Sequence, residues 1–413
     1  MNKQITYKLL IFATVFLFFA TKPSSAQTRS DSVLQPDRFR NRLEFEARPG
    51  YIIPTHNFLK GENARSKPIR NSFSTHLKYS FQFKPGSPAG SIYGIPHQGI
   101  GVAYFTFGEP QQLGAPLAVY LFQGARLAQM TSKLSLHYEW NFGLSGGWKP
   151  YHPKTNPDSR VIGSKINAYM NTGFYLNQTL SQYFNLIGGI SIAHFSNGNT
   201  QFPNAGLNTA GVKLGLMYTL NPSIMSRQSP YRGAVADFPR HVSYDIVLFG
   251  SWRRKGVYLE GKGIASPHEY PVGGFNINPM YNFGYKLRAG LSLDGIYDSS
   301  ANVYTEDYIV EPGGKNPGYT FHNPPVNKQL ALGISARAEY VMPYFTVGVG
   351  IGSNIVHGGG DLAGLYQMLA LKVEVTRNSF IHIGYNLQNF QTPNYLMLGI
   401  GYRFNNKYPC FYR

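Results

Sequence analysis

The chain of 413 residues has a single cysteine, Cys410, which rules out an internal disulfide and any metal site built from several cysteines. Acidic residues are scarce as well, with 20 Asp and Glu against 38 Lys and Arg, and charged residues make up only 14% of the chain. No long continuous apolar run follows the N-terminal region, which excludes a bundle of membrane-spanning helices. Aromatic residues, at 15%, and 45 glycines are abundant instead. This composition, with many short alternating segments, is typical of a transmembrane β-barrel.

Residues 1–26 have the pattern of a secretory signal peptide, with a lysine-bearing start, the apolar run Leu9–Ala20 and small residues up to Ala26. We predict cleavage after Ala26, followed by a periplasmic segment over residues 27–40. The signal holds three lysines and no acid, so the mature chain keeps 38 − 3 = 35 basic against 20 acidic residues, a net charge of +15. An exported protein of this charge is expected to meet anionic lipid or lipopolysaccharide phosphates rather than nucleic acid.

Strict alternation of apolar and polar residues recurs along the chain. In HLKYSFQF the apolar positions from Leu77 to Phe83 share one face, and LSLHYEWNF repeats the pattern. A soluble sandwich would alternate too, but the number of segments and the aromatics near their ends favour a barrel. The sequence therefore predicts an all-β fold, a transmembrane antiparallel β-barrel of the bacterial outer membrane with about 16 strands (range about 12–16). We expect one barrel domain over residues 41–404 and a C-terminal tail over residues 405–413.

Short and long connections fall on opposite sides of this predicted barrel. Tight turns are expected at residues 131–132 and 284–286, on the periplasmic side, and long loops around residues 149–164 and 253–272, outside. The stretch 221–240 does not fit, because it would be an atypically long periplasmic connection.

The most informative stretch is ISIAHFSNGNTQFPNAGLNTAGVKLGLMY, residues 190–218. On each of its two predicted strands, the even-numbered positions form the apolar face. His194 and Ser196 lie on that face of the first strand, and Asn208 on that of the second. All three are thus predicted on the lipid-facing surface, near one rim. Burying polar side chains in hydrocarbon costs free energy, so their presence suggests a function. If they lie at the level of the lipid headgroups instead, that cost is small and no function is implied.

The run HFSNGNTQFPNAGLN resembles the active-site stretch of the outer-membrane lipid A 3-O-deacylases, a family also called acyloxyacyl hydrolases. The resemblance is good over residues 187–218. We expect this hairpin to belong to the first part of the barrel domain, residues 41–255. Barrels of this family have eight strands, so it does not account for the second half of the chain.

The resemblance implies a role for each residue that matches the family's motif. Ser196 matches the nucleophile and His194 the general base. Asn197 and Asn204 match the oxyanion-stabilising positions, with Gly198 in the same positioning loop.

Asn208 stands where the family has an acidic residue. An Asn oxygen can orient the His ring but adds no charge to stabilise the imidazolium. No acid lies between Asp158 and Asp237 in the sequence, and Asp361 is a distant candidate for a substitute. Three hypotheses stay open: a working Ser-His-Asn site, a rescued triad, and a barrel that keeps the shape without the activity.

Taken with the resemblance, these residues predict a serine esterase that hydrolyses an ester-linked acyl chain of lipid A, with lipopolysaccharide and the bilayer as its partners. Ser-His chemistry requires no cofactor and no metal; His357 and Asp361 are expected in a rim loop rather than in a metal site. The run from Arg253 to Lys255 is either a solvated face or a grip for phosphates. The competing readings are a silent or porin-like barrel and a phospholipase-type esterase, and the oligomeric state stays open.

Overall fold

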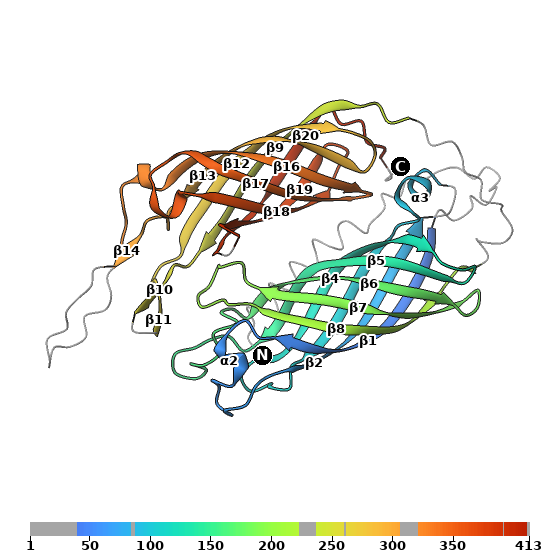
Figure 1. The fold of residues 1–413 in the computed structure, drawn as a ribbon, viewed down its shortest axis with the longest axis horizontal. Coiled ribbons are helices and arrows are strands. Elements are labelled where there is room, and N and C mark those ends of the chain that lie inside the picture. Colours follow the sequence, from blue (N-terminus) through green and yellow to red (C-terminus); the bar gives the residue numbers. More distant parts are fainter. Residues whose placement is uncertain are drawn as a thin grey trace, which may run out of the picture. The chain divides into compact units, whose positions relative to one another are not determined.

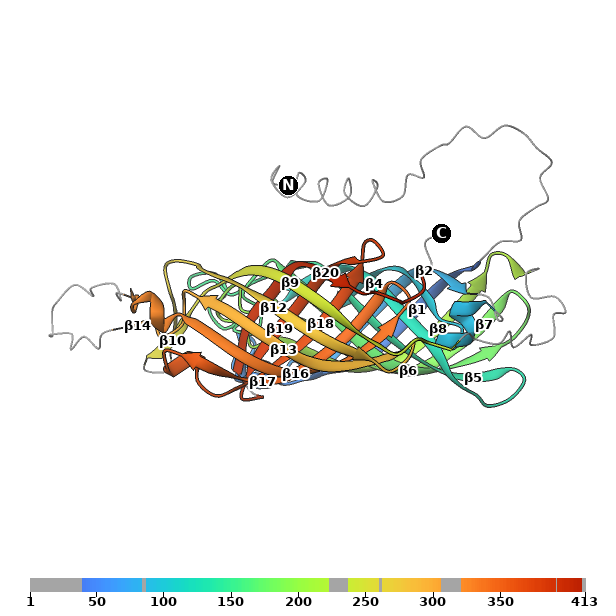
Figure 2. The same cartoon turned by 90° about the horizontal axis from the view of Figure 1, so that it is seen from above.

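The strands of the chain close into two separate antiparallel barrels of eight strands each (Figure 1). The computed structural model describes residues 39–83, 87–222, 237–259, 262–305, 321–390 and 392–410. The predicted signal peptide and the segment 27–38 lie outside the described residues. In both barrels the strands run obliquely to the barrel axis (Figure 2), as closure of a small barrel requires.

The first barrel comprises β1 (Phe39–Ile53), β2 (Asn71–Phe83), β3 (His97–Thr106), β4 (Gly114–Gln129), β5 (Leu134–Trp148), β6 (Ile166–Thr179), β7 (Phe184–Ser196) and β8 (Leu207–Thr219). The second comprises β9 (His241–Arg253), β12 (Tyr270–Asn282), β13 (Leu287–Asp298), β16 (Leu330–Met342), β17 (Phe345–His357), β18 (Leu365–Glu374), β19 (Ser379–Gln388) and β20 (Thr392–Phe404). The connections hold α2 (Asn57–Lys60), α3 (Pro88–Tyr93), the 3-10 turns η2 (Val326–Lys328) and η3 (Gly360–Leu362), and the short hairpins β10 (Gly256–Leu259) with β11 (Lys262–Ala265) and β14 (Tyr304–Thr305) with β15 (Phe321–His322).

The predicted all-β class and the count of about sixteen strands are confirmed, whereas the expectation of one barrel over residues 41–404 is wrong. The last strand of the first half, β8, pairs with β1 from Arg42↔Thr219 to Ile53↔Asn208. Likewise β20 pairs with β9. Alternation assigns faces to a strand but does not tell which strand it pairs with, so the sequence pattern is the same for one large barrel and two small ones. The stretch 221–240, which did not fit the predicted barrel, falls in sequence between β8 and β9, and residues 223–236 of it lie outside the described residues.

The outer surfaces of both barrels are apolar. Ile190 and Ile192 on β7, Leu248 on β9 and Ile400 on β20 are 64%, 55%, 61% and 69% exposed. Apolar faces of this extent are rare on soluble monomers and are what hydrocarbon requires of a spanning barrel. In the described part of the chain no helix is both long and apolar enough to cross a membrane.

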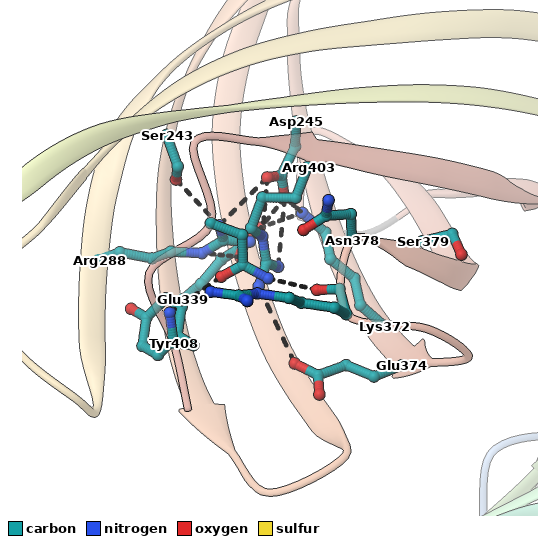
Figure 3. Close-up of polar contacts among 12 residues, drawn as sticks. Ser243, Asp245, Arg288, Glu339, Lys372, Glu374, Asn378, Ser379, Arg403 and Tyr408 are labelled. Carbon is teal, nitrogen blue, oxygen red and sulfur yellow. Dashed lines mark hydrogen bonds and ion pairs between the residues drawn. The ribbon is translucent and has the colours of Figure 1, made fainter. Parts of the chain in front are cut away.

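Charged side chains fill the interior of the second barrel (Figure 3). Asp245 accepts from Lys372 at 2.7 Å and from Arg403 at 3.0 Å. Arg288 lies between Asp245, at 2.6 Å, and Glu339, to which Lys372 also donates. All five side chains are at most 5% exposed. Such charges persist in a low-dielectric interior only because each has partners of opposite sign.

The first barrel contains a comparable network. Lys78 lies 2.8 Å from Glu46 and 2.7 Å from Glu139, and Lys213 lies 2.9 Å from Glu46. The three acids Glu44, Glu46 and Glu139 are close enough together to hold a metal ion, but Arg48, Lys78 and Lys213 already neutralise them. An open aqueous channel would leave such lumen charges in water. Their burial therefore argues against the porin-like reading.

Because Arg288 is fully buried between two carboxylates, we expect Arg288→Met to lower the free energy of unfolding by about 3–5 kcal/mol. The measurement is urea unfolding in lipid vesicles, followed by tryptophan fluorescence. Arg377→Met, in an exposed turn between β18 and β19, is the matched control and should stay near the wild-type value. Equal stabilities of the two variants would contradict the role given to the network.

Candidate active site

His194 and Asn208 face each other across β7 and β8, at the outer end of the first barrel. They are direct partners in the strand register, and His194 Nδ1 lies 2.5 Å from Asn208 Oδ1. With the Asn oxygen as acceptor, Nδ1 carries the proton and Nε2 is free to accept one. This is the tautomer that a general base needs.

Ser196 ends β7 and is only 9% exposed. Its Oγ accepts from the Gly198 backbone N–H at 3.1 Å and from Asn204 Nδ2 at 2.9 Å. Among the described residues, His194 and Ser196 make no hydrogen bond with each other. Two residues along a strand separate their Cα atoms by about 6.6 Å, and catalytic hydrogen bonds commonly tighten only when substrate binds.

Asn197 does not direct its side-chain amide at Ser196. Its Nδ2 donates to the Gln201 carbonyl at 3.2 Å, and its backbone N–H donates to Asn204 Oδ1 at 3.3 Å. Asn197 therefore braces the turn, while Asn204 and Gly198 provide the donors at Ser196. Of the predicted set, the structure gathers Ser196, Gly198 and Asn204 at one hydroxyl, and His194 with Asn208 beside them.

The loop between β7 and β8 is also held by residues that sequence reasoning missed. Thr55, just after β1, donates from Oγ1 to the Gly206 carbonyl at 2.7 Å, and the Gly206 N–H donates to Val161 O at 2.9 Å. Gly206 has φ +73°, and a Cβ there would lie 2.9 Å from His194 Cε1. Thr55 and Val161 lie far from the motif in sequence, and nothing in the local pattern marks them.

The proposed substitute acid is engaged elsewhere. Asp361 pairs with Lys255 and accepts from the Asn302 backbone N–H at 2.9 Å. Partial burial raises the pKa of Asp361, but these two donors stabilise its carboxylate and bring the net pKa below its ordinary value. No contact joins Asp361 to His194 among the described residues, so the rescued triad has no support.

The basic run 253–255 is matched by acids of the chain itself. Arg253 lies 3.2 Å from Asp298, and Arg254 lies 3.6 Å from Glu269. With Lys255 on Asp361, each charge of the run has an internal partner. The run therefore ties together the rim of the second barrel, and its geometry gives no support to a phosphate grip.

An apolar surface lies directly below the site. On β7 the outward side chains below His194 are Ile192 and Ile190, and on β8 Asn208 is followed on the same face by Ala210, Val212 and Leu214. The two Ile side chains, Val212 and Leu214 are each about half exposed or more. These apolar side chains occupy the alternate positions that the sequence predicted to face outward. An acyl chain in the outer leaflet can lie along it with its ester at the level of Ser196.

Comparison with known proteins places both halves of the chain. Residues 73–217 match the family described as lipid A 3-O-deacylase (PagL), and residues 242–406 match the family described as acyloxyacyl hydrolase, C-terminal domain. No curated protein matches the chain in sequence.

Among solved structures, the chain is similar to the Neisserial surface protein A, with 6% identity over 43% of this chain and 96% of that one and a TM-score of 0.29. It is also similar to the outer membrane protein Omp33 of Acinetobacter baumannii, with 10% identity over 89% and 99% of the two chains and a TM-score of 0.17. At these scores the likenesses carry no argument about function.

The barrels and the two family matches define an ester hydrolase of the bacterial outer membrane. The matches together span most of the chain, which belongs to the lipid A 3-O-deacylase family and is a lipid A deacylase.

The contact between Gly206 and the His194 ring predicts that Gly206→Ala lowers kcat by roughly 10- to 100-fold, because a Cβ would displace the ring. Fatty acid release from purified lipid A measures this. Gly188→Ala on β7, where an added Cβ meets no atom within 4 Å, is the control and should retain activity. A Gly206→Ala enzyme as active as the control would mean that the ring position is unimportant.

Proposed function

We propose that Ser196 is the nucleophile of this deacylase, His194 its general base, and Asn208 the residue that orients the base. The observation that carries the proposal is the convergence of two N–H donors on Ser196 Oγ beside a histidine held in the productive tautomer. The same donors can serve a carbonyl oxygen of substrate bound at the serine.

In the acylation step, Ser196 Oγ bonds to the carbonyl carbon of the ester while its proton passes to His194 Nε2. The carbonyl oxygen becomes an oxyanion, which the Gly198 N–H and the Asn204 amide stabilise, an effect worth about 3–4 kcal/mol per donor in other hydrolases. Collapse of the intermediate breaks the ester C–O bond. His194 then returns the proton to the departing alkoxide of lipid A.

Deacylation repeats the sequence with water. His194 takes a proton from water, whose oxygen attacks the acyl carbon, and Ser196 leaves with the proton that His194 gives back. The fatty acid leaves into the outer leaflet. Because Ser196 and His194 lie above the apolar surface of β7 and β8, the ester approaches laterally without passing through a barrel.

Asn208 makes this a triad without a carboxylate. Its oxygen fixes the tautomer of His194, but it adds no charge to the imidazolium of the transition state. A glutamate at this position would supply both. The Ser-His-Asn arrangement therefore gives an active but slower enzyme than its acidic counterpart.

Ser196→Ala tests the nucleophile. We expect wild-type protein, expressed in a host that makes lipopolysaccharide, to remove one acyl mass from lipid A, and Ser196→Ala to leave the lipid A mass spectrum unchanged. Ser191→Ala, on the lumen side of β7, is the matched control and should behave as wild type. A folded Ser196→Ala protein that still deacylates would refute the assignment. Acyl loss from glycerophospholipid alone would favour the phospholipase reading.

Substitutions at Asn208 test the orienting role. Asn208→Leu removes the acceptor of His194 and should lower kcat at least about tenfold, while Asn208→Glu restores an acidic acceptor and should raise kcat about tenfold above wild type. Rates on purified lipid A measure both. If the Leu variant keeps full activity, Asn208 does not orient His194; if the Glu variant is slower than wild type, the site requires the amide.

A further inference from the structure

The loop from Asn197 to Gly206, called the catalytic loop below, connects β7 and β8 of the first barrel. It carries both donors that face Ser196, the Gly198 N–H and the Asn204 amide. Its end at Gly206 is tied to the first barrel through Thr55 and Val161. Its middle residues, by contrast, contact strands and loops of the second barrel, with which the first forms one compact unit over residues 38–413.

The closest of these contacts lies at Gly198. This residue has φ +64°, and a Cβ built on it would lie 2.5 Å from Leu396 Cγ on β20. The Leu396 side chain therefore packs directly on the backbone whose N–H points at Ser196. Leu396 is itself fixed, since its carbonyl accepts from Ser251 Oγ on β9 at 2.6 Å.

Polar contacts hold the neighbouring residues of the loop. The Arg254 N–H donates to the Asn199 carbonyl at 3.2 Å, and Asn199 Nδ2 donates to the Asn394 carbonyl at 3.4 Å. Gln201 Nε2 donates to Glu269 Oε1 at 2.7 Å. Each partner belongs to the outer rim of the second barrel.

The rim residues that receive the loop are anchored within the second barrel. Arg253 donates to the Asn394 side chain and lies 3.2 Å from Asp298, and Arg254 lies 3.6 Å from Glu269. Arg253 and Arg254 thus link the loops at this rim of the second barrel to one another. The loop has hydrogen bonds of its own, such as that from Asn197 Nδ2 to the Gln201 carbonyl, and the rim of the second barrel adds contacts from outside at Gly198, Asn199 and Gln201.

We propose that the second barrel is a positioning element of the active site, in which Leu396, Asn394 and Glu269 hold the catalytic loop so that the Gly198 N–H stays aimed at the oxyanion position. This rests on the proposed role of Ser196. It gives a function to the half of the chain that carries none of the Ser-His-Asn residues. Leu396, Asn394 and Glu269 do not touch the reacting atoms; they act through the loop.

The test uses the full chain with three variants on the outward face of β20. Leu396→Ala should lower kcat about tenfold with KM unchanged, because donor geometry affects the transition state more than substrate binding. Leu396→Met, which refills the space, should recover most of the rate. Leu398→Ala, one step along the same face and 40% exposed, should match wild type. A Leu396→Ala rate equal to that of Leu398→Ala, or a raised KM at unchanged kcat, would overturn the proposal.

A double-variant cycle provides the second readout. Gly198→Ala forces a methyl group against Leu396, so its loss of kcat should be smaller in the Leu396→Ala background than in wild type. Additive losses would show that the two residues do not act together and would count against the proposal. Ser196→Ala separates the two levels: if it stays active, the nucleophile is wrong, whereas if it is inactive and the Leu396 variants equal wild type, only the positioning role fails.

Discussion

Every strand of the two barrels must find a hydrogen-bonding partner on both edges, because hydrocarbon offers none. In the first half that requirement is met when β8 returns to β1, with Ile53 opposite Asn208 at the outer end of the seam. The same closure brings Thr55, which follows β1, onto the Gly206 carbonyl. The candidate active site is therefore built beside the closing seam. In a single barrel of all strands, β8 would have another neighbour and the catalytic loop would lose this support.

Closure at eight strands has a second consequence inside the barrels. An interior of this width is filled by side chains, and here many of them are charged. The acids and bases of each lumen are matched so closely that they neutralise one another, as Arg288 does between Asp245 and Glu339. Many of the few acidic residues of the chain lie in these interiors or at the rim of the second barrel. The hairpin of β7 and β8, which holds the candidate site, has none, and the Asn208 amide is the partner of His194.

The outward faces of the strands could be predicted from the sequence, although Ser196, at the end of β7, is only 9% exposed. The alternation along β7 and β8 put His194, Ser196 and Asn208 on the outward surface, and the structure has Ile190, Ile192, Val212 and Leu214 exposed on that parity. The period of two is a local property of an extended backbone, so it survives without knowledge of the partner strands. The sequence could not predict that Asn197 stabilises the turn while Gly198 donates its N–H to Ser196, because this depends on how the loop turns.

By itself, then, the sequence determined the class of fold and the outward parity of the strands, since both follow from short-range pattern. The candidate site residues came from the resemblance of one short run to a family motif. The tertiary structure decided that the strands close twice rather than once, that Asp361 is bound to Lys255 and not to His194, and that Leu396 packs on Gly198. These are contacts between residues far apart in the chain. They depend on strand pairing and loop packing, which no local period encodes.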